Sequence, residues 1–443
     1  MNALGGTRRR AVRNGLIIAA AVVVLGGIGL ALLVFSGGRR TYPTTPEGWA
    51  ARWNAAAAEF GRTPGENWDL WLDVLSEIEG ETDPAIVGPK LDTLAGLDRF
   101  TIPVPASIGT VDIWETAVPD FGALRDALRV IAPEIKASLE HEDTDAAADW
   151  IERAWSLARV AEASGTLIGG MVQAAVVNTV FETVRPFADV VAGDPQIEEL
   201  IRSAPIPGIA WTFRMEQETG VIFIESMIAD LPLAAHDQTA IYEDVLTDWV
   251  AYGTTGDTDA RDRVQAVFDR LERNRIYRLR RAALDLILPS VERAVGNLKA
   301  TRVERDALLV MLALERFWDE HGSYPHALDQ LVPEQLAAIP ADPFADNAPL
   351  RYRLVDPDSD DPMTAYVLYS VGHNGTDEGG TENPSLVGRG LTDPDHGADH
   401  ILNRLPPPPR PTGIFEDDPD DQPNEQPADQ ADEQPSNPAE AVP

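Results

Sequence analysis

Residues 306–325 read DALLVMLALERFWDEHGSYP, a run of helix-forming residues that stops abruptly. Glycine is common just past a helix end, and a proline shortly beyond it prevents the helix from continuing. We therefore predict a helix that ends at Gly322, with Pro325 just after it. The sequence pattern changes here, because residues before this point have helical periodicity and residues after it are typical of short loops and strands.

Two strands are expected downstream of this helix. Residues 350–354 (LRYRL) alternate apolar and charged side chains, and residues 365–371 (AYVLYSV) are rich in β-branched and aromatic residues. The acidic segment 356–361 supplies the turn between them, so we predict an antiparallel pair packed on the preceding helix. Tyr352 and Tyr369 are expected on the sheet face that contacts this helix.

The order of these elements resembles the C-terminal part of the major pseudopilin of type II secretion systems, as found in membrane-anchored proteins of planctomycete-type bacteria. The resemblance covers about residues 306–380. It rests on Gly322 with Tyr324-Pro325, on Asp342-Pro343-Phe344, on Tyr352, and on residues 369–372 (YSVG). The resemblance implies a pilin-type α+β module, reused here as a domain, and a link to secretion or envelope proteins.

In that family, the loop after the last strand holds a calcium ion through acidic side chains and carbonyl groups. The matching region here is residues 373–401, and it is longer than the family's loop. The resemblance implies calcium ligands among the oxygen-bearing side chains of this region, which are Asn374, Asp377, Asp393, Asp395 and Asp399. The alternative interpretation is a solvated acidic loop in a very acidic protein.

Residues 15–35 (GLIIAAAVVVLGGIGLALLVF) carry no charged side chain. Twenty-one helical residues span about 31 Å, close to the hydrocarbon thickness of a bilayer. Four arginines precede this segment and an acid-rich chain follows it, which predicts a cytoplasmic N-terminus and an extracytoplasmic body. We predict an uncleaved signal anchor in the inner membrane, since the apolar run is longer than that of a cleaved signal peptide.

The N-terminal segment differs from a pseudopilin at the processing site. Gly15 is followed by Leu16, and the fifth position after Gly15 is Ala20 where a pseudopilin has glutamate. These differences favour a permanent anchor over direct membership of a secretion filament.

The composition excludes several classes of function. The formal net charge is −36, which disfavours nucleic acid as a partner and predicts that the body stays off anionic lipid surfaces. The chain has no cysteine, so disulfides and thiolate chemistry are absent. The motifs GxSxG, HExxH and SxxK are missing, and the sequence therefore predicts a protein that is not an enzyme. An envelope hydrolase that uses paired carboxylates is the alternative.

The pattern of apolar residues between about 44 and 314 predicts a body that is mostly helical. A helix is expected to start at Thr45, with Trp49, Trp53 and Phe60 on one face, and the next segment repeats this pattern. The residues expected on the shared face of that next segment are Trp68, Trp71, Leu72 and Leu75. Further helices are predicted over 194–202, 239–251, 257–286 and 289–314, and an extended connection over 101–119.

Two features of the helical body invite a functional interpretation. Gly165, Gly169 and Gly170 lie in the apolar run 148–184, where they allow a second helix to approach closely. A dense group of arginines follows later, at Arg273, Arg275, Arg278, Arg280 and Arg281. We expect these arginines to pair with nearby acids rather than to form an anion site.

The sequence therefore predicts a mainly α chain in four parts. These are a basic segment with a transmembrane anchor (1–40), a helical extracytoplasmic domain (41–300), a pseudopilin-like α+β module with an acidic loop (301–405) and a disordered tail (406–443). The tail holds eleven prolines, ten acids and one base. The expected function is a membrane-anchored protein that binds or scaffolds envelope partners, with contact to the bilayer through residues 15–35.

Overall fold

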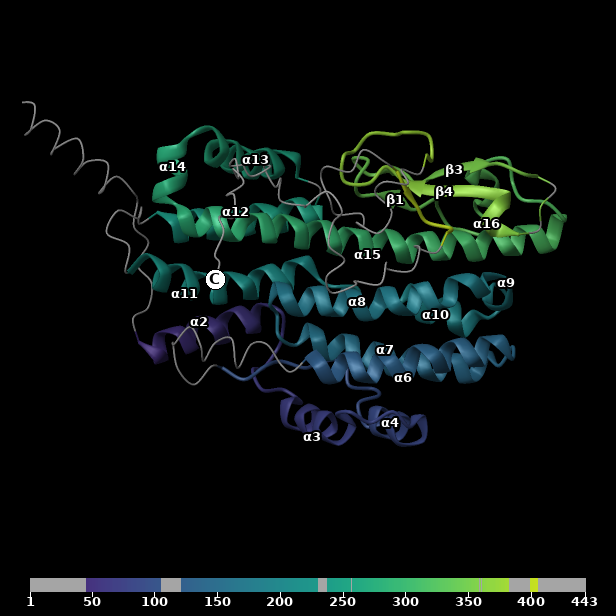
Figure 1. The fold of residues 1–443 in the computed structure, drawn as a ribbon, viewed down its shortest axis with the longest axis horizontal. Coiled ribbons are helices and arrows are strands. Elements are labelled where there is room, and N and C mark those ends of the chain that lie inside the picture. The colour runs from purple at the N-terminus through teal and green to yellow at the C-terminus, as the bar shows by residue number, and fades with distance from the viewer. Residues whose placement is uncertain are drawn as a thin grey trace, which may run out of the picture. The chain divides into compact units, whose positions relative to one another are not determined.

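The computed structural model describes residues 45–104, 121–229, 237–255, 257–357, 359, 361–381 and 399–404. These residues belong to one compact unit that is mainly helical, with small antiparallel sheets near the end of the described chain (Figure 1). The predicted mainly α fold with a small antiparallel sheet is confirmed. The membrane helix predicted at 15–35 and the tail predicted at 406–443 lie outside the described residues.

The described helices of the body run from α2 to α15. Their bounds are α2 (Pro46–Glu59), α3 (Trp68–Ile78), α4 (Pro84–Asp92), α6 (Phe121–Glu140), α7 (Thr144–Glu162), α8 (Leu167–Val184), η1 (Arg185–Phe187), α9 (Ala188–Val191), α10 (Pro195–Arg202), α11 (Ile209–Ala229), α12 (Gln238–Thr255), α13 (Thr258–Arg273), α14 (Arg275–Arg280) and α15 (Ala282–His321). Figure 1 shows α6, α7, α8 and α15 side by side, with α11 packed against α12.

The predicted helix start at Thr45 is confirmed. The hydroxyl oxygen of Thr45 accepts a hydrogen bond from the backbone N–H of Gly48 at 3.2 Å, which caps α2. In α3, by contrast, Leu72 does not share the buried face, because its side chain is 43% exposed while Trp71 is fully buried. Consecutive residues point about 100° apart around a helix, so Leu72 faces solvent when its neighbour Trp71 faces the core.

The apolar run 148–184 forms two helices rather than one. Gly165 adopts a φ of 64° between α7 and α8, a conformation that glycine takes without strain. A Cβ atom on Gly165 would lie 2.6 Å from the side chain of Met215, so this position admits no larger residue. The predicted role in close helix packing is confirmed for Gly165 and Gly170, where α11 approaches, while Gly169 lies against Ser164 and the end of α7.

One segment of the described chain, Leu167–Val191, is long and apolar enough to cross a membrane by length and composition alone. Half of its most apolar window is buried inside the fold, where α8 contacts α6, α7 and α15. The core helix of a soluble protein has the same properties, so this segment is weak evidence for a membrane span.

The predicted helix over 257–286 is wrong, because the structure divides these residues among α13, α14 and the start of α15. Asn274 separates the first two, and its side-chain oxygen accepts a hydrogen bond from the N–H of Tyr277 at 2.9 Å. Such local hydrogen bonds favour helix starts over helix interiors. Helix α15, in contrast, continues through Pro289 and through the predicted domain boundary between residues 300 and 301.

Helix α15 contains 40 residues and is therefore about 60 Å long. All seven residues from Leu308 to Leu314 are buried, so this part of the helix is covered on every side. Helices α8, α9 and α10 contact α15, and residues of the small sheet belong to the same hydrophobic cluster. The body and the C-terminal module therefore share one core.

The C-terminal module is built on the end of α15. Its elements are η2 (Leu328–Leu331), β1 (Ala341–Asp342), β2 (Ala348–Pro349), β3 (Arg351–Leu354), α16 (Pro362–Ala365), β4 (Tyr366–Ser370) and β5 (His400–Ile401). The predicted helix end is confirmed, since Gly322 caps α15 with a φ of 68°. The predicted antiparallel pair is β3 and β4, and β5 adds a third strand at the other edge of β4.

The pairing register places Tyr352 and Tyr369 on opposite faces of the sheet. Tyr352 lies opposite Leu368, and neighbouring residues of a strand point to opposite faces. Tyr352 faces the core as predicted, where its hydroxyl donates a hydrogen bond to the carbonyl of Pro325 at 2.8 Å. The prediction is wrong for Tyr369, which lies on the outer face close to Gly380.

A buried carboxyl group lies where α15 meets the module. Glu315 is 5% exposed, and its Oε1 atom accepts a hydrogen bond from the hydroxyl of Tyr324 at 2.9 Å. The ring of Tyr324 in turn makes an edge contact with Tyr366, with the ring centroids 5.0 Å apart. Burial raises the pKa of Glu315 to about 7, against the opposing effect of the hydrogen bond from Tyr324.

We predict that Glu315→Gln makes the protein more stable at pH 8. The pKa of Glu315 is higher in the folded state than in the unfolded chain, so ionisation lowers stability as the pH rises from about 4.5 to about 7. The effect is on the order of 3 kcal/mol, and glutamine can still accept the hydrogen bond from Tyr324. Urea unfolding of the full chain in detergent at pH 5 and pH 8 measures this change.

The control variant is Glu320→Gln, which removes an exposed carboxylate from the same helix. An equal change in the pH dependence of both variants would contradict the prediction.

Candidate functional site

The loop that follows β4 is fixed at its start by Asp342. The buried carboxylate of Asp342 accepts hydrogen bonds from the backbone N–H groups of Phe344, at 2.9 Å, and Val371, at 3.0 Å. The first bond closes the turn at Asp342-Pro343. The second holds the residue at which the chain leaves β4, so Asp342 sets where the loop begins.

Asn374 and Asp377, two of the predicted ligands, lie in this loop. The side-chain oxygen of Asn374 accepts a hydrogen bond from the N–H of Thr376, and its amide group donates one to Glu378, both at 2.9 Å. Asn374 therefore shapes the turn and orients the carboxylate of Glu378.

Asp377 is held against the outer face of the sheet. Its Oδ1 atom accepts hydrogen bonds from the hydroxyl of Tyr369 at 3.1 Å and from the N–H of Gly379 at 2.9 Å, and its Oδ2 atom lies 3.4 Å from the guanidinium group of Arg351. Burial and the neighbouring carboxylate of Asp377 raise the pKa of Tyr369 to about 12.

Asp399, the third predicted ligand in the described chain, reaches the same loop from the start of β5. Its Oδ2 atom accepts a hydrogen bond from the N–H of Gly380 at 2.7 Å. Among the described residues, the buried atoms Oδ1 of Asp399 and Oε2 of Glu378 have no hydrogen-bond partner. Burial raises the pKa of Asp399 against the opposing effect of backbone N–H groups of Gly380 and Glu378, and the nearby carboxylates of Glu378 and Asp377 raise it further.

This arrangement fits a hard cation in its chemistry. Buried carboxylate oxygens without donors cost free energy, and calcium prefers such oxygens as ligands. Within the described part of the chain, no three His, Asp or Glu side chains are grouped closely enough to hold a metal ion by themselves. The predicted ligands Asp393 and Asp395 lie outside the described residues.

Glu378 is not among the ligands that the sequence predicts. Its position next to Asp377, followed by the two glycines Gly379 and Gly380, was the signal available in the sequence. Gly379 and Gly380 adopt φ values of 76° and 71°, and this turn brings the N–H of Gly380 to Asp399. The pairing of residues 378–380 with residue 399 depends on β5, which is too short to predict.

A second buried group of charges ties β5 to the helices. The carboxylate of Glu304, on α15, pairs with Arg185 of η1 and lies 2.7 Å from Nε2 of His400. The Arg185 side chain is 3% exposed. Burial alone would raise the pKa of Glu304, but Arg185 and His400 lower it to about 2.

We predict that Glu304→Gln destabilises the folded protein by about 3–5 kcal/mol near pH 7, because it leaves the buried guanidinium group of Arg185 without its counter-charge. The stabilisation by Glu304 is present above pH 4.5 and is lost as the pH falls towards 2, so the difference from the wild type shrinks over that range. Urea unfolding at several pH values measures it.

Glu320→Gln, an exposed change on the same helix, is the matched control. A Glu304→Gln variant that is no less stable than this control would contradict the prediction.

The hydrolase alternative needs two carboxyl groups that act together. Two carboxyl groups of the described chain have unusual pKa values. Glu216 on α11 and Glu315 on α15 each have a pKa of about 7, raised mainly by burial. Each accepts a hydrogen bond from one tyrosine, which is Tyr242 for Glu216 at 3.1 Å and Tyr324 for Glu315 at 2.9 Å. These are two separate carboxyl–tyrosine pairs, and the hydrolase alternative stays a prediction.

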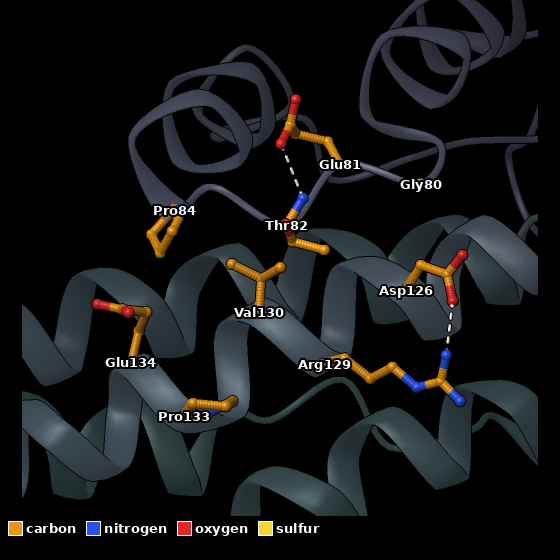
Figure 2. Close-up of a pocket in the computed structure, with 9 residues that line it drawn as sticks. All are labelled: Gly80, Glu81, Thr82, Pro84, Asp126, Arg129, Val130, Pro133 and Glu134. Carbon is orange, nitrogen blue, oxygen red and sulfur yellow. Dashed lines mark hydrogen bonds and ion pairs between the residues drawn. The ribbon is translucent and has the colours of Figure 1, made fainter.

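A shallow hollow of about 410 Å³ lies between the α3–α4 connection and α6 (Figure 2). The carboxylate of Glu81 accepts hydrogen bonds from the N–H groups of Thr82 and Asp83, at 2.8 and 3.0 Å. Asp126 pairs with Arg129 at 3.0 Å, as Figure 2 shows. These acids therefore stabilise the turn and the helix surface around the hollow.

Comparison of the chain with protein-family models, with curated proteins and with solved structures found no match. The resemblance of residues 306–380 to the pseudopilin module therefore stays a prediction from the sequence.

Proposed function

We propose that this chain is a membrane-anchored, non-enzymatic envelope protein whose pseudopilin-like module binds or scaffolds other envelope proteins. The observation that carries the proposal is the course of α15, which packs within the body along its first part and within the module along its last part. A module built on the same helix as the body is held rigidly by it. Such a support suits a docking surface better than a mobile appendage.

The anchor is residues 15–35, inserted in the inner membrane as a single pass. The basic residues before this segment stay in the cytoplasm and the described part of the chain is extracytoplasmic. The partners would be secretion-system or other envelope proteins that meet the module outside the cytoplasm.

The loop after β4 binds calcium in this proposal. The supporting observations are the buried oxygens of Asp399 and Glu378, which have no hydrogen-bond partner among the described residues, and the neighbouring carboxylate of Asp377. Asp393 and Asp395 would supply further ligands, and calcium accepts a shell of this kind without strict geometry. A bound cation would also offset the repulsion among these carboxylates.

We predict that terbium, which emits light when a nearby aromatic ring is excited, binds this loop and is displaced by calcium. Tyr369 is the expected sensitiser, because its hydroxyl donates to Asp377. Asp399→Asn is expected to weaken binding about tenfold or more, since it removes an anionic ligand while keeping an oxygen that can accept from Gly380. Titration of the full chain in detergent measures both ions.

Asp329→Asn, which removes an exposed acid from η2, is the control. Terbium emission that calcium does not displace, or that falls equally in both variants, would contradict a calcium site.

The scaffolding role is tested by purification of the full chain from solubilised membranes in calcium. We expect envelope or secretion-system proteins to copurify with the wild type and to be lost with Asp399→Asn, while Asp329→Asn retains them. Recovery of the chain alone, together with normal secretion in a deletion strain, would overturn the proposal.

A further inference from the structure

The arginine-rich segment around α14 differs in charge from the rest of the chain. Residues 270–281 hold six arginines and one acid, in a chain whose net charge is −36. Some of these arginines are used within the fold. Arg281 pairs with Asp237 and lies over the ring of Tyr277, and Arg273 pairs with Asp269 at 2.7 Å. The expected pairing with nearby acids is therefore observed for these two residues.

Arg275 and Arg278 project outward instead. The Arg275 side chain is exposed, and no ion pair of the described residues includes it. Arg278 is 47% exposed and lies 3.9 Å from Asp285, the outer limit of an ion pair. Surface pairs of this kind contribute little, so both guanidinium groups remain accessible to an external anion.

Three large apolar side chains are exposed beside these arginines. Ile276 and Leu279 are 64% and 76% exposed and lie three residues apart on α14, so they share one face. Leu286, in the second turn of α15, is 63% exposed and follows Asp285, the neighbour of Arg278. We call Arg275, Ile276, Arg278, Leu279 and Leu286 the α14 patch.

The α14 patch lies at the end of the body that is nearest to the predicted membrane segment along the chain. In Figure 1, α14 and the first turn of α2 lie at the same end of the helices, whereas the module lies at the other end of α15. Ten residues, 36–45, separate the predicted membrane segment from α2, and an extended chain of that length reaches at most about 35 Å. The end that carries the α14 patch is therefore within reach of the bilayer.

We infer that the α14 patch docks on the surface of the bilayer, with Ile276, Leu279 and Leu286 at the headgroup boundary and Arg275 and Arg278 on anionic phospholipid headgroups. This contact is a second one beside the anchor, and it rests on the proposed anchoring through residues 15–35. Apolar side chains flanked by arginines are the composition that interfacial helices use to bind anionic membranes.

The acidity of the whole chain does not prevent this contact. Charges are screened beyond about 8 Å at physiological ionic strength, so the charge next to the lipid decides the interaction. The acidic tail, residues 406–443, is the competing occupant for the same arginines, and the experiment below separates the two.

The test uses the full chain, which contains no cysteine, with a single cysteine introduced by Leu279→Cys and labelled with a nitroxide. The protein is placed in lipid nanodiscs with or without phosphatidylglycerol, and the access of a water-soluble nickel relaxant to the label is measured. Leu72→Cys on α3 is the matched control, because Leu72 is an exposed leucine (43%) outside the α14 patch.

We expect the label at position 279 to be protected from nickel in nanodiscs that contain phosphatidylglycerol, and the label at position 72 to stay accessible. The double change Arg275→Gln and Arg278→Gln is expected to lower the ratio of docked to undocked protein about thirtyfold, because each basic residue near an anionic surface contributes about fivefold. High salt should also lower the ratio of docked to undocked protein.

Three outcomes distinguish failure of this inference from failure of the anchor. A chain that does not comigrate with the nanodiscs refutes the anchoring and the docking together. A chain that comigrates but whose label at position 279 is as accessible as that at position 72 overturns the docking alone. Protection that is equal without anionic lipid and disappears when residues 406–443 are deleted assigns the patch to the tail, and also overturns it.

Discussion

The fold depends on the burial of α15, which is complete over residues 308–314. A helix surrounded by apolar side chains on every side must be covered on every side, and residues 308–314 impose this demand just before the helix ends. The body covers part of this surface through α8, α9 and α10, and the module contributes Tyr366 and Leu368 of β4 to the same cluster. The small sheet is too short to be stable alone, and the body without it would leave this cluster incomplete.

Polar groups within this buried region determine how the module sits on the helix. Glu304 and Glu315 are eleven positions apart on α15, and each has a partner from another segment. Burial acts on both carboxyl groups with opposite results: the pKa of Glu304 falls to about 2 because Arg185 and His400 face it, while that of Glu315 rises to about 7 because its partner is a neutral tyrosine. A shift of the module along α15 would separate Glu304 from His400 and Glu315 from Tyr324, so these two contacts favour one register.

The sequence-based predictions that the structure confirms depend on interactions between residues close together in the chain. The cap at Thr45, the helix end at Gly322 and the alternation in β3 depend on residues within a few positions of one another. The predictions that are wrong concern residues whose orientation depends on segments far away in the chain. Leu72 could be assigned to the wrong face because helical periodicity does not say which neighbour covers a helix, and Tyr369 because the face of each residue depends on the register between β3 and β4.

The candidate calcium site also combines residues that the sequence predicts with one that only the structure reveals. Asn374, Asp377 and Asp399 could be named from residue type and a resemblance, but the contribution of Glu378 arises from the turn at Gly379 and Gly380 meeting Asp399 on β5. That contact joins residues 19 positions apart through a strand of only two residues. The carboxylates differ in environment for this reason, since Asp377 accepts from Tyr369 while Asp399 has one oxygen without a partner in the described part of the chain.

The two proposed contacts of the chain lie at opposite ends of α15, and its length gives this separation a consequence. A single membrane helix followed by ten linking residues would let the body tilt in any direction. A second contact at the α14 patch removes this freedom, because the start of α15 is then held at the headgroups. The remaining part of the helix, from Leu286 to His321, is about 50 Å long and would separate the module from the lipid if α15 stands away from the bilayer. In the proposed docked orientation, the acidic loop would face partners outside the membrane and its carboxylates would stay clear of anionic headgroups.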